Sequence, residues 1–184
     1  MTTPNRRPRH VSRRAFNLVE VIATIVIIGM LGAISAGVLR TAVDGYADAA
    51  TRAELVNAAS ATLERMVTTL RDVPLRAAVT PAEPAITTIT TDSITMHNGD
   101  GVARVGADLQ LIIAGVASSL TGDVSDFQIR AFDQDNAAMA LSLSGDACDP
   151  IRRLELTLTL SRNGVSETLR TRVFLRCMMR GAAP

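Results

Sequence analysis

The sequence predicts an α+β fold in which a long N-terminal helix packs on an antiparallel β-sheet. Residues 16–73 contain no proline, are almost wholly apolar at first, and then carry apolar residues at helical spacing, which indicates one helix. Residues 85–177 contain short runs rich in Thr, Ile, Leu and Val that are separated by turn residues, which indicates strands. Pro74, Pro81 and Pro84 lie between the two regions and mark the end of the helix.

The apolar first part of this helix, residues 16–39, is long enough to cross a membrane, since it spans about 36 Å at about 1.5 Å per residue. Its one charged residue is Glu20, and no acidic residue precedes it. Five arginines do precede it, and basic residues beside a membrane helix stay on the cytoplasmic side; they are Arg6, Arg7, Arg9, Arg13 and Arg14. We therefore expect a single-pass membrane protein with a cytoplasmic N-terminus.

The order of features at the N-terminus differs from that of a secretory signal peptide, in which the small-residue cleavage site follows the apolar stretch. Here the small residue Ala15 comes before that stretch. Cleavage after Ala15 removes the arginines and leaves the apolar helix on a mature protein that begins at Phe16. Such a product is a subunit stored in the membrane.

The residues from Arg13 to Val21, RRAFNLVEV, resemble the precursor motif of type IV pilins and pseudopilins: a small residue, Phe, Thr, Leu, any residue, Glu. In that family the prepilin peptidase cuts before the phenylalanine and methylates its amine. The resemblance implies that Ala15 precedes the cut, that Phe16 is the methylated N-terminus and that Glu20 is used in assembly. Ala15 stands where glycine is usual, and Asn17 where threonine is commonest.

The resemblance also implies a pilin-like fold and a structural role. The chain is then a minor pseudopilin or pilin-like subunit of a type II secretion or type IV pilus filament, assembled by lateral helix packing in the bacterial inner membrane. Its implied partners are the prepilin peptidase, other pilins or pseudopilins, and membrane lipid. The pattern from Arg152 to Arg176 is similar to the closing hairpin of J-type and pilus-W-type minor subunits, which suggests a tip or priming role.

Glu20 is expected to need a positive partner on physical grounds alone, because an unpaired carboxylate in hydrocarbon costs about 2.5–3.5 kcal/mol on insertion scales. The nearest positive group after cleavage is the Phe16 amine, in the same helix or in a neighbouring subunit. The positive end of the helix dipole also favours a carboxylate in the first turn. The alternative is a glutamate that extends to the lipid headgroups.

Four segments follow from these patterns: a leader at 1–15, a transmembrane helix at 16–39, its periplasmic continuation at 40–73 and a β-rich periplasmic domain at 74–184. Residues 85–96 read as strand, and HNGDG after them as a turn. Residues 109–116 fit either a buried strand or a helix end. Residues 127–131 and 139–143 alternate in polarity around Asp133–Asn136, which suggests a hairpin.

The clearest hairpin spans residues 151–177, with Asn163 and Gly164 as a two-residue type I′ turn. If Arg162 lies opposite Val165, leucines at 154, 156 and 158 share one face and Glu155 lies opposite Arg172. The same register puts Cys148 one diagonal step from Cys177, within disulfide reach if the chain bends at Pro150. A disulfide there resembles the disulfide-bounded C-terminal region of many pilins, and the alternative is two separate buried thiols.

No catalytic arrangement is evident, and we expect no enzyme activity, no cofactor and no metal site. His10 lies in the leader, and His97 stands in a turn beside no Ser or Cys nucleophile. Acidic residues could offer oxygen ligands to calcium, but they lack the spacing of a calcium loop and read as solvated turns; they are Asp133, Asp135, Asp146 and Asp149.

Two other functions remain open. A DNA-capturing, competence-type minor pilin requires an exposed strip of arginines, for which Arg152, Arg170, Arg172 and Arg176 are candidates, with Glu155 partly neutralising them. Removing the five leader arginines from 19 basic residues leaves 14 against 18 acidic ones, so we expect no nucleic-acid partner. A simple signal-anchored periplasmic protein explains the apolar helix but leaves the leader motif and Glu20 unexplained.

Overall fold

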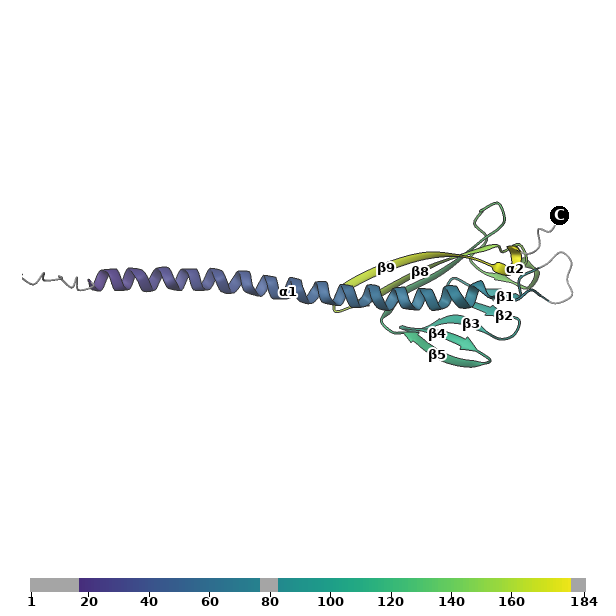
Figure 1. Cartoon of the computed structure of the whole chain (residues 1–184), viewed down its shortest axis with the longest axis horizontal. Helices are drawn as coiled ribbons and strands as arrows, with labels where there is room; N and C mark the ends of the chain where they lie inside the picture. Colours follow the sequence, from purple (N-terminus) through teal and green to yellow (C-terminus); the bar gives the residue numbers. More distant parts are fainter. Residues whose placement is uncertain (1–16, 77–82, 180–184) are drawn as a thin grey trace, which may run out of the picture. The chain divides into compact units, whose positions relative to one another are not determined.

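The computed structural model describes residues 17–76 and 83–179, which form one long helix and two antiparallel sheets (Figure 1). The chain divides into two compact units, one that ends at Tyr46 and one that begins at Ala47. Helix α1 (Leu18–Arg71) contributes residues to both. The helix packs against the sheets through its C-terminal part, and this arrangement confirms the predicted α+β class.

Helix α1 has the extent that the sequence predicts, within two residues at each end among the residues described. Asn17 precedes its first turn, and Arg71 lies in its last turn, three residues before Pro74. Within the second unit, one face of the helix is buried, and its residues mostly recur every three or four positions. They are Leu55, Ala59, Thr62, Leu63, Met66 and Leu70. Met66 and Leu70 are 0% exposed.

The larger sheet has six strands in the order β5-β4-β3-β2-β1-β7. Its members are β1 (Ile86–Ile89), β2 (Ser93–Met96), β3 (Gly101–Val105), β4 (Asp108–Ile113), β5 (Val116–Thr121) and β7 (Leu143–Ser144). The stretch at 85–96 is thus two strands rather than one, because Thr90 forms a turn in which its Oγ1 accepts the Ser93 N–H over 3.0 Å. The stretch at 109–116, which the pattern left open, comprises most of β4, a turn at Ala114 and Gly115, and the first residue of β5.

The smaller sheet has three strands in the order β6-β8-β9. They are β6 (Val124–Phe132), β8 (Arg153–Arg162) and β9 (Val165–Phe174), and the leucines of β8 face the hydrophobic core. The predicted β8–β9 register is confirmed, with Leu154 opposite Val173, Leu158 opposite Leu169 and Arg162 opposite Val165. Asn163 and Gly164 have φ of 52° and 82°, the positive values that a type I′ turn requires.

The predicted hairpin between residues 127–131 and 139–143 forms only next to its turn, where an antiparallel bridge joins Phe132 to Ala138 and the Met139 N–H donates to the Ala131 carbonyl over 3.0 Å. Strand β6 forms its ladder with β8 instead. Leu143 and Ser144 instead pair with Ile89 and Thr88 of β1, in the other sheet. Alternation shows which side of a strand is buried but not which strand lies beside it, so local pattern could not reveal this partner.

The end of the chain also differs from the regular hairpin. Strand β9 stops at Phe174, and residues from Arg176 form a short helix, α2 (Arg176–Met179). Cys177 therefore lies on a helix rather than opposite Pro150 in the ladder. Cys148 ends a 3-10 turn, η1 (Gly145–Cys148), that precedes β8.

Candidate functional site

The predicted processing site lies at the edge of what the structure describes, because Ala15 and Phe16 fall outside the described residues. Asn17 is the first residue described, and its backbone oxygen accepts the N–H groups of Glu20 and Val21 over 2.9 and 3.2 Å. These bonds mark the beginning of α1. The peptide that the prepilin peptidase is expected to cut is therefore close to the start of the helix in sequence.

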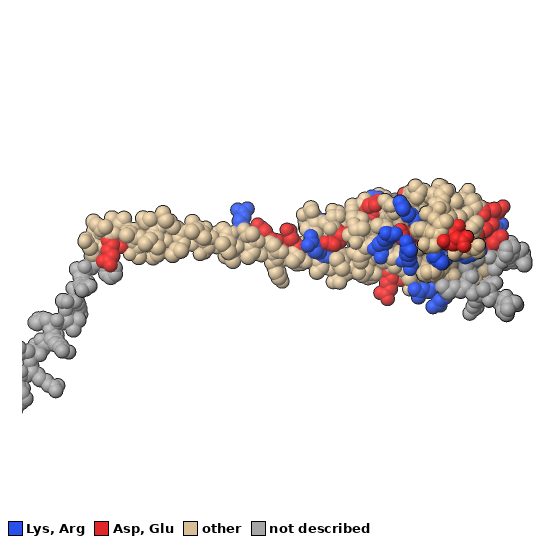
Figure 2. All heavy atoms as spheres, turned by 90° about the horizontal axis from the view of Figure 1, so that it is seen from above, with Lys and Arg blue, Asp and Glu red and all other residues tan. Residues whose placement is uncertain are grey.

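Glu20 lies in the first turn of α1, where the unpaired N–H groups of the helix favour a negative charge. Its side chain is exposed, and no described side chain forms an ion pair with its carboxylate. Glu20 and Arg40 bound a stretch with no other charged residue. In Figure 2 a long part of the helix is tan, the colour of residues that are neither acidic nor basic.

Helix α1 is the one described helix that is long and apolar enough to span a membrane. The side chains of its first part are exposed throughout, including Ile25, Ile28 and Leu31. Two threonine hydroxyl groups of the helix are satisfied within it, since Thr24 Oγ1 donates to the Glu20 carbonyl over 2.6 Å and Thr41 Oγ1 to the Gly37 carbonyl over 3.1 Å. Apart from the Glu20 carboxylate and the Ser35 hydroxyl, the surface between Glu20 and Arg40 is therefore suited to lipid or to apolar helices.

A second candidate site is the side of the β6-β8-β9 sheet that faces away from the leucines. Register places three cross-strand rows there: Phe132-Arg153-Phe174, Arg130-Glu155-Arg172 and Gln128-Thr157-Arg170. We call these nine residues the arginine face. It brings together four arginines that lie up to 42 positions apart in the sequence, with one glutamate among them.

Glu155 is the buried centre of the arginine face, only 3% exposed. Its Oε2 accepts a hydrogen bond from Arg172 Nε over 2.7 Å and another from Arg170 Nη2. Burial by itself raises the pKa of a carboxyl group, but the hydrogen bonds and charges of Arg170 and Arg172 hold the pKa of Glu155 below its ordinary value. Glu155 therefore stays ionised and orients both guanidinium groups.

Aromatic rings contact two arginine side chains of the face, Arg172 and Arg153. The Arg172 guanidinium lies 5.2 Å from the centre of the Phe132 ring, and that of Arg153 lies 5.0 Å from the Phe174 ring, both within cation–π range. Arg153 Nη1 also donates to Asn136 Oδ1 over 2.8 Å. Arg130 has neither a hydrogen bond nor an ion pair with any described side chain.

The four arginines that were candidates for one DNA-binding strip do not lie together in the structure. Arg170 and Arg172 lie on the arginine face, but Arg176 begins α2 and places its Nη1 3.4 Å from Asp72 Oδ1. Arg152 precedes β8 and donates through Nη1 to the Asp149 carbonyl over 2.6 Å. Sequence reasoning missed Arg130 and Arg153. The alternation of Phe127, Ile129 and Ala131 already placed Arg130 on the outer side, but the pairing of β6 with β8 was not foreseen.

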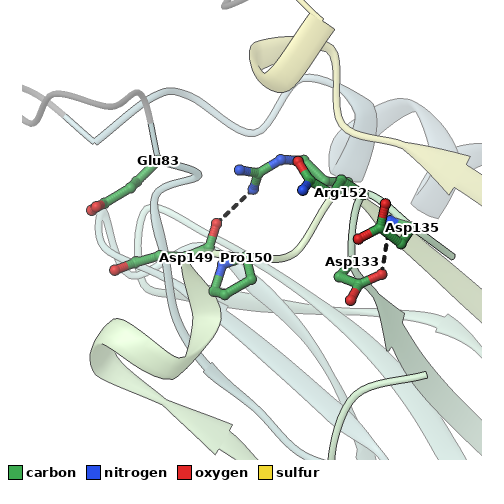
Figure 3. A pocket seen from close by; sticks show the side chains of 7 residues that line it. Glu83, Asp133, Asp135, Asp149, Pro150 and Arg152 are labelled. Carbon is green, nitrogen blue, oxygen red and sulfur yellow. Dashed lines mark hydrogen bonds between the residues drawn. The ribbon is translucent and has the colours of Figure 1, made fainter. Parts of the chain in front are cut away.

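Three of the four acidic residues that suggested calcium ligands lie around one open hollow (Figure 3). Asp133, Asp135 and Asp149 line this hollow of about 320 Å³ together with Glu83, Gln134, Pro150 and Arg152. Asp133 Oδ1 accepts the N–H groups of Asp135 and Ala137 over 2.9 and 2.8 Å, which stabilises the turn after β6. Arg76 Nη1 lies 3.6 Å from Glu83 Oε2 and 3.9 Å from Asp149 Oδ1. Within residues 17–76 and 83–179, no three His, Cys, Asp or Glu side chains are grouped to hold a metal ion.

Both cysteines lie in the hydrophobic core of the second unit, Cys148 at 0% and Cys177 at 9% exposure. Cys148 is a thiol in the structure, and its Sγ donates to the Thr87 carbonyl over 3.9 Å. Burial and the charge of Asp149 raise the pKa of Cys148. The disulfide between Cys148 and Cys177 remains a prediction about the oxidised protein.

Comparison of the chain with models of protein families and with curated proteins found no match.

Proposed function

We propose that this chain is a pilin-like subunit, a minor pseudopilin or minor pilin that is cut before Phe16 and assembled through its N-terminal helix. The observation that carries the proposal is the position of Glu20. It is the one acidic residue in an exposed apolar stretch, it lies in the first turn of α1, and the leader ends five positions before it, with Arg13-Arg14-Ala15. A simple signal anchor needs neither the leader motif nor this carboxylate.

The glycines of the apolar stretch support assembly by helix packing. A Cβ atom added at Gly29, Gly32 or Gly37 meets nothing within 4 Å, so the chain's own packing does not require glycine there. Small residues let the backbones of neighbouring helices approach closely in a membrane. In the proposed mechanism lipid covers this stretch while the subunit is stored, and helices of other subunits replace the lipid on assembly.

In this mechanism the carboxylate of Glu20 determines the axial position of one helix relative to the next. A buried carboxylate needs a positive partner, and the α-amine that cleavage creates at Phe16 is the partner that a neighbouring subunit can offer. Formation of this pair would set the axial position of one helix against the next. Cleavage and assembly are then coupled, because the amine does not exist before the cut.

No specific contact in the described residues favours the DNA-capturing alternative. Two of its four arginines are engaged elsewhere, Arg152 with the Asp149 carbonyl and Arg176 with Asp72. The 13 arginines of residues 47–184 are outnumbered by 16 acidic residues, which disfavours a long polyanion.

Expression of the full chain with a prepilin peptidase tests the proposal. Intact-mass analysis of membrane material should show a protein that begins at Phe16 and carries one additional methyl group. The control is the same expression with an inactive peptidase, which should leave residues 1–15 attached. Ala15→Gly should be cut normally and Ala15→Leu poorly, because the family motif requires a small residue there. Retention of the leader on the wild-type chain beside the active peptidase would contradict the proposal.

A further inference from the structure

The arginine face is positively charged and its arginine side chains are largely held in place, as in a binding surface. Four arginines and one glutamate give it a formal charge of +3, whereas residues 47–184 as a whole carry −3. Arg130, Arg170 and Arg172 are exposed, and they come from the two outer strands of the sheet, Arg130 from β6 and the other two from β9. Figure 2 shows arginine side chains gathered on the folded part with acidic side chains around them.

The contacts of Glu155 show that these arginines bind a carboxylate. Its carboxylate takes two guanidinium hydrogen bonds at once, and charge-assisted contacts of this kind are the strong ones. Arg170 and Arg172 remain 58% and 48% exposed in this arrangement, so part of each guanidinium still faces solvent. A side chain that is already ordered loses less conformational freedom when a ligand binds. The face is therefore organised for further carboxylates.

The arginine face is small. Residues on one side of a strand repeat every 6.6–6.8 Å or so, and neighbouring strands lie about 4.8 Å apart, so the three rows cover roughly 14 by 10 Å. Asp126 occupies the next row at one end of β6, opposite Thr159, and Asp133 follows Phe132 at the other end. A long, uniformly charged polymer would meet these carboxylates at both ends.

A short acidic segment of a protein fits this geometry better than a nucleic acid. An extended peptide of about four residues matches the length of the three rows at about 3.3 Å per residue. Phe174, 46% exposed beside Arg153, adds an apolar contact of the kind that Arg and aromatic residues provide at the centre of protein interfaces.

We propose that the arginine face binds a short acidic segment of a partner protein, with carboxylates between Arg130, Arg170 and Arg172. Arg130 is the best residue for a test, because it has no bond to a described side chain that its loss would break. The matched control is Arg65, also exposed and without such a bond, on α1.

The experiment uses the full chain in neutral detergent and a fluorescein-labelled tetraglutamate peptide, with binding followed by fluorescence anisotropy. Wild-type protein should bind the peptide, and added salt should weaken binding. Arg130→Gln should raise the Kd by about two- to five-fold, as the loss of one exposed ion pair predicts, while Arg65→Gln should leave it unchanged. Arg130→Glu should raise it further.

Three results would overturn the proposal: no salt-dependent binding of tetraglutamate, equal weakening by Arg65→Gln and Arg130→Gln, or tighter binding of a fluorescein-labelled pentathymidine oligonucleotide, whose four phosphates equal in number the side-chain carboxylates of the peptide. The last result, if Arg130→Gln also weakens it, would identify the face as a nucleic-acid surface. The five leader arginines are the same in every variant, so the comparison of Arg130→Gln with Arg65→Gln does not depend on whether the chain is cut at Ala15 or assembles into a filament.

Discussion

Glu155 lies directly across the β8–β9 ladder from Arg172, whose Nε donates to the buried Glu155 Oε2 over 2.7 Å. Arg170, one step along the same face, donates to the same oxygen. A carboxylate that is only 3% exposed would be costly without such partners. The Glu155–Arg172 pair therefore stabilises the sheet and also holds the arginine side chains of the face in place.

Replacing Arg172 by alanine should destabilise the protein, because Glu155 keeps only Arg170 and Phe132 loses its cation–π contact. We expect the free energy of unfolding to fall by about 1.5–3 kcal/mol, the usual cost of losing a hydrogen bond to a charged group. Denaturant unfolding of the full chain in detergent measures the change. Arg130→Ala is the matched control, since Arg130 lies opposite Glu155 in β6 without bonding to it, and should shift stability by no more than about 0.5 kcal/mol. Equal effects of the two substitutions would argue against a specific role for the Glu155–Arg172 pair.

The lowered pKa of Glu155 predicts a pH dependence. Its ordinary value is 4.5, and the folded value lies below it, so the ionised pair contributes its full stability above about pH 4.5 and loses it as the pH falls through the folded pKa. Glu155→Gln removes this contribution while it keeps the side-chain shape. The stability difference between the wild type and Glu155→Gln should therefore be constant from pH 5 to about pH 7 and shrink below about pH 4.5. A difference that stays unchanged down to pH 3 or so would contradict the assignment.

Replacing Glu20 by leucine should separate storage in the membrane from assembly. Membrane abundance should hold or rise, because an insertion cost of about 2.5–3.5 kcal/mol disappears. Cross-linking to partner pilins, or co-purification with them, should fall, because the Phe16 amine loses its counter-ion. Quantifying both in the same membranes gives the test.

Asp44→Leu provides the control for Glu20→Leu, since it removes an exposed carboxylate from the same helix beyond the apolar stretch. It should leave association unchanged. If neither abundance nor association changes in Glu20→Leu, Glu20 only extends to the headgroups; if abundance collapses, the carboxylate stabilises the single subunit and the assembly role is wrong.

A disulfide between Cys148 and Cys177 should form in the oxidising compartment that we propose for the second unit. Non-reducing peptide mapping of protein from that compartment should recover the linked pair. In the chain-entropy model such a loop contributes about 3–4 kcal/mol, which reduction should remove. In the reduced protein, burial and the raised pKa of Cys148 should keep its thiol unreactive toward iodoacetamide until denaturant is added. Recovery of two alkylated cysteines from denatured, unreduced protein would refute the disulfide.

Sequence alone was enough for helix α1 and for the β8–β9 hairpin, whose structures depend on neighbours along the chain. The extent of α1 follows from apolar spacing and from the absence of proline before Pro74. The β8–β9 register follows from Asn163-Gly164, because a two-residue turn leaves its flanking strands one pairing, and that pairing also put Glu155 opposite Arg172. The exposure of Glu20 within an apolar stretch was likewise readable from the residues around it.

Only the tertiary structure decided which distant segments lie together. Strand β6 could have paired with the residues after Asn136, but it pairs with β8, and this choice brings Arg130 beside Glu155. Likewise β7 joins β1, and Cys177 leaves the ladder for α2. Alternating polarity specifies the buried side of each strand, whereas the identity of its neighbour depends on how all strands share one core. The helix and the hairpin were thus determined by the sequence alone, and the arginine face by the packing of the whole second unit.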